Sequence, residues 1–219
     1  MAAQILGLSA SPIANSNTDR AVQAVLAATG METVFIKLHQ LKLSPCRACL
    51  GCVKSNVCVQ QDDGQALARQ FREARAFVLG AWTPYSSLDA MSKLFMERMY
   101  CLRHQTGLNR GKIGALVVTT ACDPAVPQLP PAAQTAIGQV AVWMMEEGMT
   151  NLGSMTLLGN VPCIRCGHGD DCPMSGIKML HGPDANVASV GVRSFGADQQ
   201  QAAARELGAK LRAAVLAAG

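Results

Sequence analysis

The sequence predicts an α/β protein built on a doubly wound parallel sheet of five strands. Five short apolar runs alternate along the chain with longer amphipathic stretches, which is the pattern of strands joined by crossover helices. The apolar runs are nearly continuous, as in strands that are covered on both faces. Of the 219 residues, 49% are hydrophobic and 16% charged, so the chain can bury one large core and differs from a disordered protein.

The first sixty residues predict one strand–helix–strand unit. Gln4–Leu8 (QILGL) predicts a buried strand, and the segment after it, rich in Ser and Asn, predicts a loop. Asn17 or Thr18 can cap the following helix, because their side chains accept hydrogen bonds from free backbone N–H groups. Gly30 ends that helix, and Glu32–Lys37 follows as the second strand.

The rest of the chain continues this alternation. The remaining expected strands are Ala76–Ala81, Lys112–Thr119 and Thr150–Leu158, and the remaining expected helices are Gly64–Ala74, Ala90–Leu102, Pro131–Glu147 and Asp198–Ala217. Five strands with helices between them suit the flavodoxin-like strand order 2-1-3-4-5. We therefore expect one flavodoxin-like domain over residues 1–219, with a cysteine loop at 44–61 and a cysteine-rich insertion at 159–186.

Composition and charge exclude several classes of function. The apolar runs fall short of the ~20 residues that cross a bilayer, and the N-terminus lacks the positive charge of a signal peptide. We therefore expect no membrane association and a cytoplasmic location. The net charge of +4 is small and the basic residues are scattered, so nucleic-acid binding is not expected. The most basic stretch is expected to be solvated; it contains Lys93, Arg98, Arg103, Arg110 and Lys112.

Nine cysteines are the most informative feature of the composition. Their number is odd, and seven of them fall into two tight clusters. In a chain without an export signal, clustered cysteines indicate metal binding or redox chemistry rather than a disulfide framework.

The first cluster has the spacing Cx2Cx2Cx5C. It consists of Cys46, Cys49, Cys52 and Cys58. Three thiolates, each separated from the next by two residues, can hold three corners of an iron–sulfur cubane, and the fourth can return to the remaining iron. Zinc is the main alternative, although structural zinc sites more often use two separate CxxC pairs. A set of free thiols is the third.

The second cluster has the spacing Cx2Cx5C and consists of Cys163, Cys166 and Cys172. With His168 or Cys122 as a fourth ligand, it could hold zinc or a second iron–sulfur cluster. Cys163 and Cys166 could instead form a redox-active dithiol, and reduced surface thiols are the third alternative. The sequence leaves this choice open.

The loop after the first strand is a candidate phosphate site. Its hydroxyl and amide side chains precede a helix, whose first N–H groups attract anions; they are Ser9, Ser11, Ser16, Asn17 and Thr18. The Walker and dinucleotide glycine patterns are both absent from the sequence. A hydroxyl-rich loop with little glycine suits flavin mononucleotide (FMN), and a plain helix cap is the alternative.

Three stretches carry a resemblance to a known family: GLSASPIANSNT, the Cx2Cx2Cx5C loop after the second strand, and TPYSSLDAMSKLFMERM after the third. The final helix, with ARELGAKL, is also similar. The chain resembles the iron–sulfur flavoproteins, a branch of the NADPH-dependent FMN reductase superfamily. The resemblance implies a homo-oligomer, dimeric or tetrameric, that binds FMN and a [4Fe-4S] cluster.

The resemblance also implies which residues hold each group. The first loop would bind the FMN phosphate, and the cysteines of the first cluster would hold the [4Fe-4S] cluster. The remaining flavin contacts would come from Pro84, Tyr85, Ser86, Ser87, Thr119, Thr120 and Ala121.

We therefore expect an FMN-dependent oxidoreductase that transfers electrons between a flavin and an iron–sulfur cluster, with ferredoxin or NAD(P)H as donor. One alternative is an NAD(P)H-dependent FMN reductase of quinones, flavins or metal ions without a cluster. Another is a metal-binding or thiol redox-sensing protein on a flavodoxin scaffold.

Overall fold

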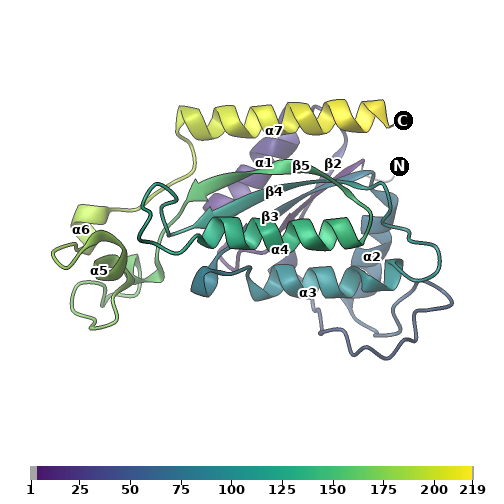
Figure 1. Ribbon diagram of the computed structural model, residues 1–219, viewed down its shortest axis with the longest axis horizontal. Coiled ribbons are helices and arrows are strands. Elements are labelled where there is room, and N and C mark those ends of the chain that lie inside the picture. Colours follow the sequence, from purple (N-terminus) through teal and green to yellow (C-terminus); the bar gives the residue numbers. More distant parts are fainter. Residues whose placement is uncertain (1–3, 219) are drawn as a thin grey trace.

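A computed structural model describes residues 4–218; residues 1–3 and 219, the two ends of the predicted domain, lie outside the described part. Its centre is one parallel sheet of five strands in the order β2-β1-β3-β4-β5, which confirms the predicted fold (Figure 1). The strands are β1 (Ile5–Ser9), β2 (Thr33–Lys37), β3 (Ala76–Trp82), β4 (Ile113–Thr120) and β5 (Thr150–Leu158). Every pair of neighbouring strands is parallel, so the carboxyl ends of the strands share one edge.

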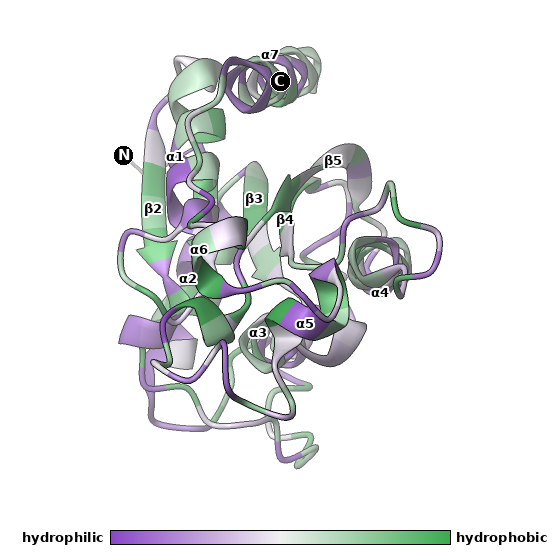
Figure 2. Ribbon diagram, turned by 90° about the vertical axis from the view of Figure 1, so that its left-hand side faces the viewer, coloured by the Kyte–Doolittle hydropathy of each residue, from purple (hydrophilic) through white to green (hydrophobic). Residues whose placement is uncertain are grey.

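Helices cover both faces of the sheet. One face carries α1 (Asn17–Thr29) and α7 (Asp198–Ala217), and the other carries α2 (Asp63–Glu73), α3 (Ala90–Arg98) and α4 (Ala132–Glu146). Figure 2 looks along the strands and shows hydrophobic strands between these two layers. Within residues 4–218, no helix is long and apolar enough to cross a membrane.

Local signals fix α1 at both ends. Ser16, rather than Asn17 or Thr18, is the N-cap: its hydroxyl accepts a hydrogen bond from the backbone N–H of Asp19 (3.1 Å), and the Asp19 carboxylate accepts one from the Ser16 N–H (3.2 Å). This reciprocal arrangement is a capping box. Gly30 ends the helix with φ of 58°, a left-handed conformation that glycine adopts without a steric penalty.

An aromatic cluster fills the core beneath α2, α3 and α4. The rings of Phe71 and Phe95 meet edge to face with centroids 5.3 Å apart, and Trp143 contacts Phe77 at 5.9 Å in the same geometry. Such pairs contribute about 0.5–1.5 kcal/mol each beyond the burial of their surface. The cluster anchors α3, whose carboxyl end faces the cysteine loop.

Two details differ from the sequence prediction. The helix expected at Ala90–Leu102 is α-helical only to Arg98, and the chain then tightens into a 3-10 turn at Met99–Leu102. Arg98 and Lys112, expected in solvent, are 2% and 7% exposed. Both were misjudged because each guanidinium or ammonium group finds buried oxygen acceptors far away in the sequence.

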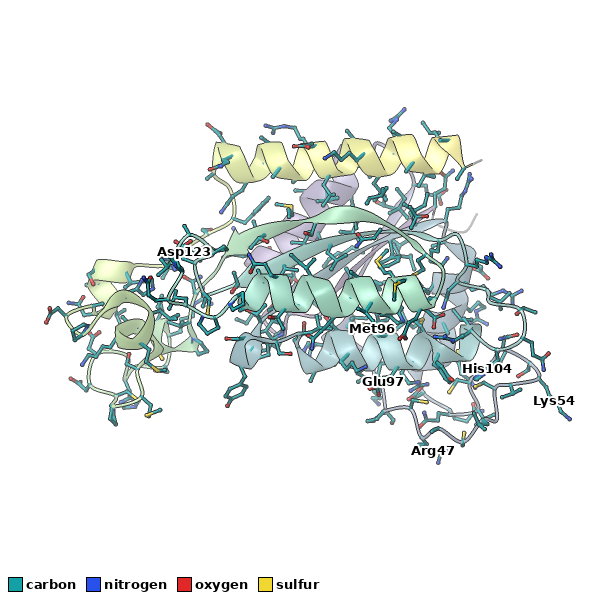
Figure 3. The ribbon with its side chains drawn as sticks, viewed as in Figure 1. Arg47, Lys54, Met96, Glu97, His104 and Asp123 are labelled. Atoms are coloured by element: carbon teal, nitrogen blue, oxygen red, sulfur yellow. The ribbon has the colours of Figure 1, made fainter. Side chains whose placement is uncertain are left out.

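The two cysteine-rich segments lie at opposite ends of the sheet. The segment after β5 contains a 3-10 turn (Pro162–Ile164), α5 (Gly176–His181) and α6 (Val187–Val190), and it projects beyond the carboxyl ends of the strands (Figures 1 and 2). The cysteine loop runs back to the amino-terminal ends. In Figure 3, Arg47 and Lys54 of that loop lie at the other end of the molecule from Asp123, which follows β4.

Candidate functional site

A pocket of about 520 Å³ opens at the carboxyl ends of the strands. This volume lies in the range of small-molecule sites, and the position is the switch point where doubly wound sheets bind ligands. Its walls come from the loop after β1, the ends of β3 and β4, and the insertion after β5. Five of the predicted flavin residues line it: Ser11, Ser16, Asn17, Thr18 and Thr119.

Ser9 lies beneath this pocket, and its side chain is fully buried. Its hydroxyl donates to a carboxylate oxygen of Asp19 at 2.5 Å, and Lys37 forms an ion pair with the other oxygen at 2.5 Å. Asp19 also accepts the Ser16 N–H. Ser9 therefore acts through Asp19, which holds the loop in position and whose charge is balanced by Lys37.

Hydroxyl groups join the loop to the central sheet. The hydroxyl oxygens of Thr18 and Thr119 are 2.8 Å apart, so the start of α1 is bonded to the end of β4. Thr120 is buried, and its hydroxyl accepts the backbone N–H of Cys122 at 3.1 Å. Thr120 and the neighbouring Ala121 are outside the pocket lining.

The predicted flavin segment after β3 lies apart from the pocket wall. Pro84–Ser86 forms a 3-10 turn, and none of Pro84, Tyr85, Ser86 and Ser87 lines the pocket. Tyr85 is completely exposed, and Tyr85 and Ser86 have φ values of 49° and 56°. Non-glycine residues rarely adopt this conformation, and such strain gathers at binding sites.

Asparagine side chains bind the insertion to the loop. Asn17 donates to the carbonyl of Arg193 at 3.0 Å and accepts the N–H of Phe195 at 3.0 Å. Asn160 pairs with the same Arg193 backbone, donating at 2.8 Å and accepting at 2.7 Å. Asn17 therefore joins the loop after β1 to the insertion, and both form the pocket wall. The phosphate contact that the sequence predicts for Asn17 stays a prediction.

Three arginines of the pocket lining were missed by the sequence analysis: Arg20, Arg165 and Arg193. Arg165 and Arg193 come from the insertion, whose position over the loop has no local sequence signal. Arg20 lies one turn into α1 and could have been found from its place in the helix that follows the loop.

Two donors in the lining point to a ligand. The indole N–H of Trp82 and the Nε–H of Arg20 are buried and meet no acceptor within residues 4–218. Buried donors without acceptors are costly, so a bound anion or heterocycle would relieve this. The residues present therefore fit a phosphorylated flavin.

The second candidate site is a cavity around the cysteine loop. The four cysteines of the first cluster line it, together with Arg98, Tyr100, Cys101 and His104. Cys101 is buried, and both Cys101 and His104 lie in the cavity wall. The Nε2 atom of His104 is buried and has no partner in the described part of the chain.

Arg98 of α3 forms hydrogen bonds to the cysteine loop that surrounds this cavity. Its guanidinium makes two bonds to the Asp62 carboxylate, at 2.5 and 2.7 Å, and a third to the carbonyl of Ser44 at 2.8 Å. Its Nη2 also lies 3.5 Å from the sulfur of Cys58. The hydrogen bonds from Arg98 lower the pKa of Asp62 to about 2. The pair thus ties both ends of the cysteine loop to α3.

The sulfur atoms are close enough to influence each other's charge. Burial raises the pKa of Cys52, and the neighbouring Cys46, Cys49 and Cys58 raise it further. Burial, followed by the charges of Cys58 and Cys52, raises the pKa of Cys101 to about 11. A bound cation would remove this mutual repulsion, because metals bind thiolates.

The donor set of this cavity fits an iron–sulfur cluster or zinc, since both bind soft thiolates. Among the described residues, no three Cys, His, Asp or Glu side chains are arranged around one point in metal-binding geometry. The cavity holds only about 30 Å³, so binding a metal or cluster requires the cysteine loop to rearrange. Ala48, Leu50 and Asn56 have left-handed φ values between 49° and 56°, which bend the loop over the cavity.

The second cysteine cluster lies beside the first pocket. Cys166 lines that pocket, whereas Cys163, Cys172, His168 and Cys122 are outside its lining. The Cys163 sulfur accepts the N–H of Gly176 at 3.2 Å, and the Cys166 sulfur accepts the N–H of His168 at 3.4 Å.

The strand order and the pocket at the switch point define a flavodoxin-like α/β protein. A family model described as "NADPH-dependent FMN reductase" matches residues 3–131, more than half of the chain. The chain belongs to the NADPH-dependent FMN reductase family, whose members are FMN-dependent oxidoreductases.

Curated relatives include iron–sulfur flavoproteins. One from Methanocaldococcus jannaschii is 32% identical over 121 residues, covering 54% of this chain and 62% of the relative. One from Methanosarcina thermophila is 27% identical over 115 residues, covering 51% and 60%. The chain thus spans less than two thirds of the length of these relatives. Among solved structures, an archaeal flavodoxin shares the fold, with a TM-score of 0.52 at 14% identity over 97% of this chain and 98% of that one.

Proposed function

We propose that this protein is an FMN-dependent electron-transfer oxidoreductase that holds FMN in the pocket at the strand ends and a [4Fe-4S] cluster on Cys46, Cys49, Cys52 and Cys58. The observation that carries the proposal is the second cavity: four cysteines spaced Cx2Cx2Cx5C line one wall, with a buried arginine beside one sulfur. The names of the relatives support the same pairing of flavin and cluster.

The pocket binds the phosphate of FMN through its loop. Ser11, Ser16 and the first residues of α1 line the pocket, where the positive end of the helix favours an anion. Arg165 and Arg193 add positive charge from the insertion. Trp82 supplies an N–H donor at the end of β3.

When bound, FMN supplies exchange of one or two electrons and the cluster supplies exchange of one. The chain positions and tunes both groups. The Nη2 atom of Arg98 lies 3.5 Å from the sulfur of Cys58, so a cluster held there would have a positive charge and a hydrogen-bond donor beside one of its ligands.

A second copy of the chain completes this arrangement. The pocket and the cysteine cavity lie at opposite ends of the sheet (Figure 3). A function that joins the two therefore brings the cysteine loop of one copy to the pocket of another. Exposed apolar side chains on the loop and on the outer face of α4 suit such contacts: Leu50, Val57, Val59, Val142 and Met145.

A second candidate is an NAD(P)H-dependent reductase that uses FMN alone, which the description of the matching family favours. It requires the pocket but not the cysteine cavity.

Anaerobic reduction of the FMN-loaded protein separates the two candidates. Under the first, reduced ferredoxin bleaches the flavin absorbance in the wild type, and Cys49→Ser slows this at least tenfold. Cys172→Ser, a cysteine of the other cluster, reacts like the wild type. If NADPH bleaches the wild type and Cys49→Ser at equal rates while ferredoxin does not, the second candidate is correct.

A further inference from the structure

We infer that Cys163 and Cys166 form a redox-active thiol pair in the wall of the flavin pocket, which converts reversibly between dithiol and disulfide by exchange with a small disulfide or dithiol. The position beside a flavin rests on the proposed function; the thiol chemistry does not.

The two cysteines are spaced for a disulfide. The backbone N–H groups of Arg165 and Cys166 both donate to the carbonyl of Pro162, at 2.9 and 3.1 Å, so the segment forms one tight turn. A turn of this kind brings the Cα atoms of its first and fourth residues within about 7 Å of each other. Disulfides join Cα atoms about 4.4–6.8 Å apart, so the backbone spacing of the pair is compatible with a disulfide.

Packing and a buried hydrogen bond hold this turn in place. A Cβ atom at Gly169 would lie 2.5 Å from the carbonyl oxygen of Cys163 and 3.0 Å from Ile177, so only glycine allows this close approach. The buried hydroxyl of Ser175 donates to the carbonyl of Gly169 at 2.6 Å. The contacts hold the cysteine turn against α5 and limit the motion of the pair.

Hydrogen bonds position both sulfurs. Gly176 donates its N–H to Cys163, His168 donates its N–H to Cys166, and the Cys166 thiol donates to the carbonyl of Cys163 at 3.4 Å. Arg165, between the two cysteines, adds positive charge to the turn. Both thiols are free in this structure, which is the reduced state of the pair.

The difference in exposure indicates which cysteine attacks a substrate disulfide and which one resolves the mixed disulfide. Cys166 is exposed and lines the pocket, whereas Cys163 is partly buried. The Cys166 thiolate attacks one sulfur of a disulfide RSSR, forming a mixed disulfide and releasing RS⁻. The Cys163 thiolate then attacks the Cys166 sulfur and releases the second RS⁻. Two electrons pass to RSSR, and the two thiol protons end on the two released thiols.

Peptide mapping tests the pair on flavin-free protein equilibrated with oxidised glutathione. Arg165 separates the cysteines, so trypsin leaves their disulfide as a link between peptides 113–165 and 166–178. We expect this link in the wild type and in Cys172→Ser and Cys122→Ser, and its loss on reduction. Cys163→Ser should instead keep glutathione on Cys166. Absence of the link at every glutathione ratio would overturn the inference.

A metal site is the competing outcome. One zinc per chain that disappears in Cys172→Ser or His168→Ala, together with no disulfide link, would replace the thiol pair by a structural metal. FMN then tests the location: saturating flavin should slow alkylation of Cys166 several-fold and leave Cys172 unchanged. Unchanged alkylation of Cys166 with FMN bound would place the pair away from the flavin. Failure to bind FMN would overturn the proposed function while leaving the disulfide measurable.

Discussion

Arg98 and Asp62 form a bidentate ion pair, with N–O distances of 2.5 and 2.7 Å, directly behind the sulfur of Cys58. The guanidinium side chain is 1% exposed and the carboxylate 12%. Ion pairs of this kind are costly to form but still more costly to break, since the remaining charge stays buried. The pair links α3 to the end of the cysteine loop, so it sets both the stability of that region and the position of one thiol.

Breaking this pair should unfold the region readily. Arg98→Met leaves the Asp62 carboxylate without its partner, and we expect the free energy of unfolding to fall by about 3–5 kcal/mol, measured by urea denaturation. The exposed pair Lys93–Glu97 provides the control. Lys93→Met should change the free energy of unfolding by less than about 1 kcal/mol. Equal, small losses in both variants would mean that Arg98 is not a structural tie.

Because Lys112 is buried, we expect the free energy of unfolding to depend on pH in the alkaline range. Burial lowers its pKa to about 8, although its Nζ donates to the carbonyls of Ala74 and Arg72. Between pH 8 and the ordinary value of 10.5, the unfolded chain binds a proton that the folded chain lacks. Stability contributed by this group therefore rises with pH across that window.

Lys112→Met removes the titrating group and keeps its packing on Phe71, which the ammonium group contacts at 4.9 Å from the ring centre. The free energy of unfolding of the wild type relative to Lys112→Met should therefore increase from pH 8 to pH 10.5. A difference that stays constant over this range would show that Lys112 titrates normally in the folded protein.

The arginines of the insertion should recognise the phosphate of the flavin. Arg165→Gln is expected to weaken FMN binding about tenfold, equal to a loss of about 1.4 kcal/mol, since it removes a charge from the pocket lining. Riboflavin, which has no phosphate, should bind both proteins equally. Fluorescence titration with the two ligands checks this, and equal weakening of both would assign Arg165 to the shape of the pocket.

The bond between Thr18 and Thr119 should also support the pocket. Thr119→Val keeps the shape of the side chain and removes the hydroxyl that lies 2.8 Å from Thr18. A lost hydrogen bond of this kind costs about 0.5–1.5 kcal/mol, and we expect a comparable weakening of flavin binding. Thr135→Val is the control, because the exposed Thr135 hydroxyl donates only to the carbonyl of Pro131 at the start of α4. Identical affinity of Thr119→Val and wild type would exclude this bond from the site.

The fold followed from the sequence because its signals are local. The apolar runs, the polar loop before α1 and Gly30 each act within a few residues, and the right-handed crossover rule then leaves few strand orders. The spacing of the four cysteines, which is also local, indicated that they would lie together, and all four line the cysteine cavity. The rest of the cavity wall was not foreseen, because Arg98 reaches the loop from α3, 36 residues beyond its partner Asp62, and His104 comes from after that helix.

The flavin pocket, too, could be predicted only in part from local sequence. The residues of the first loop that line it were identified from their place at a strand end, but Arg165 and Arg193 depend on how the insertion folds back. Asn17 and Asn160 make that fold through paired bonds to one backbone segment. Nothing in the local sequence marks these long-range contacts. Ser9 was assigned to the phosphate for its residue type, whereas its buried hydroxyl supports Asp19.

Counting iron, acid-labile sulfide and FMN in protein purified without oxygen tests whether the chain holds both a flavin and a [4Fe-4S] cluster. We expect about four irons and four sulfides with one FMN per chain, and loss of the iron but not the flavin in Cys46→Ser. One FMN per chain without iron, or zinc in place of iron on the same cysteines, would contradict the proposal.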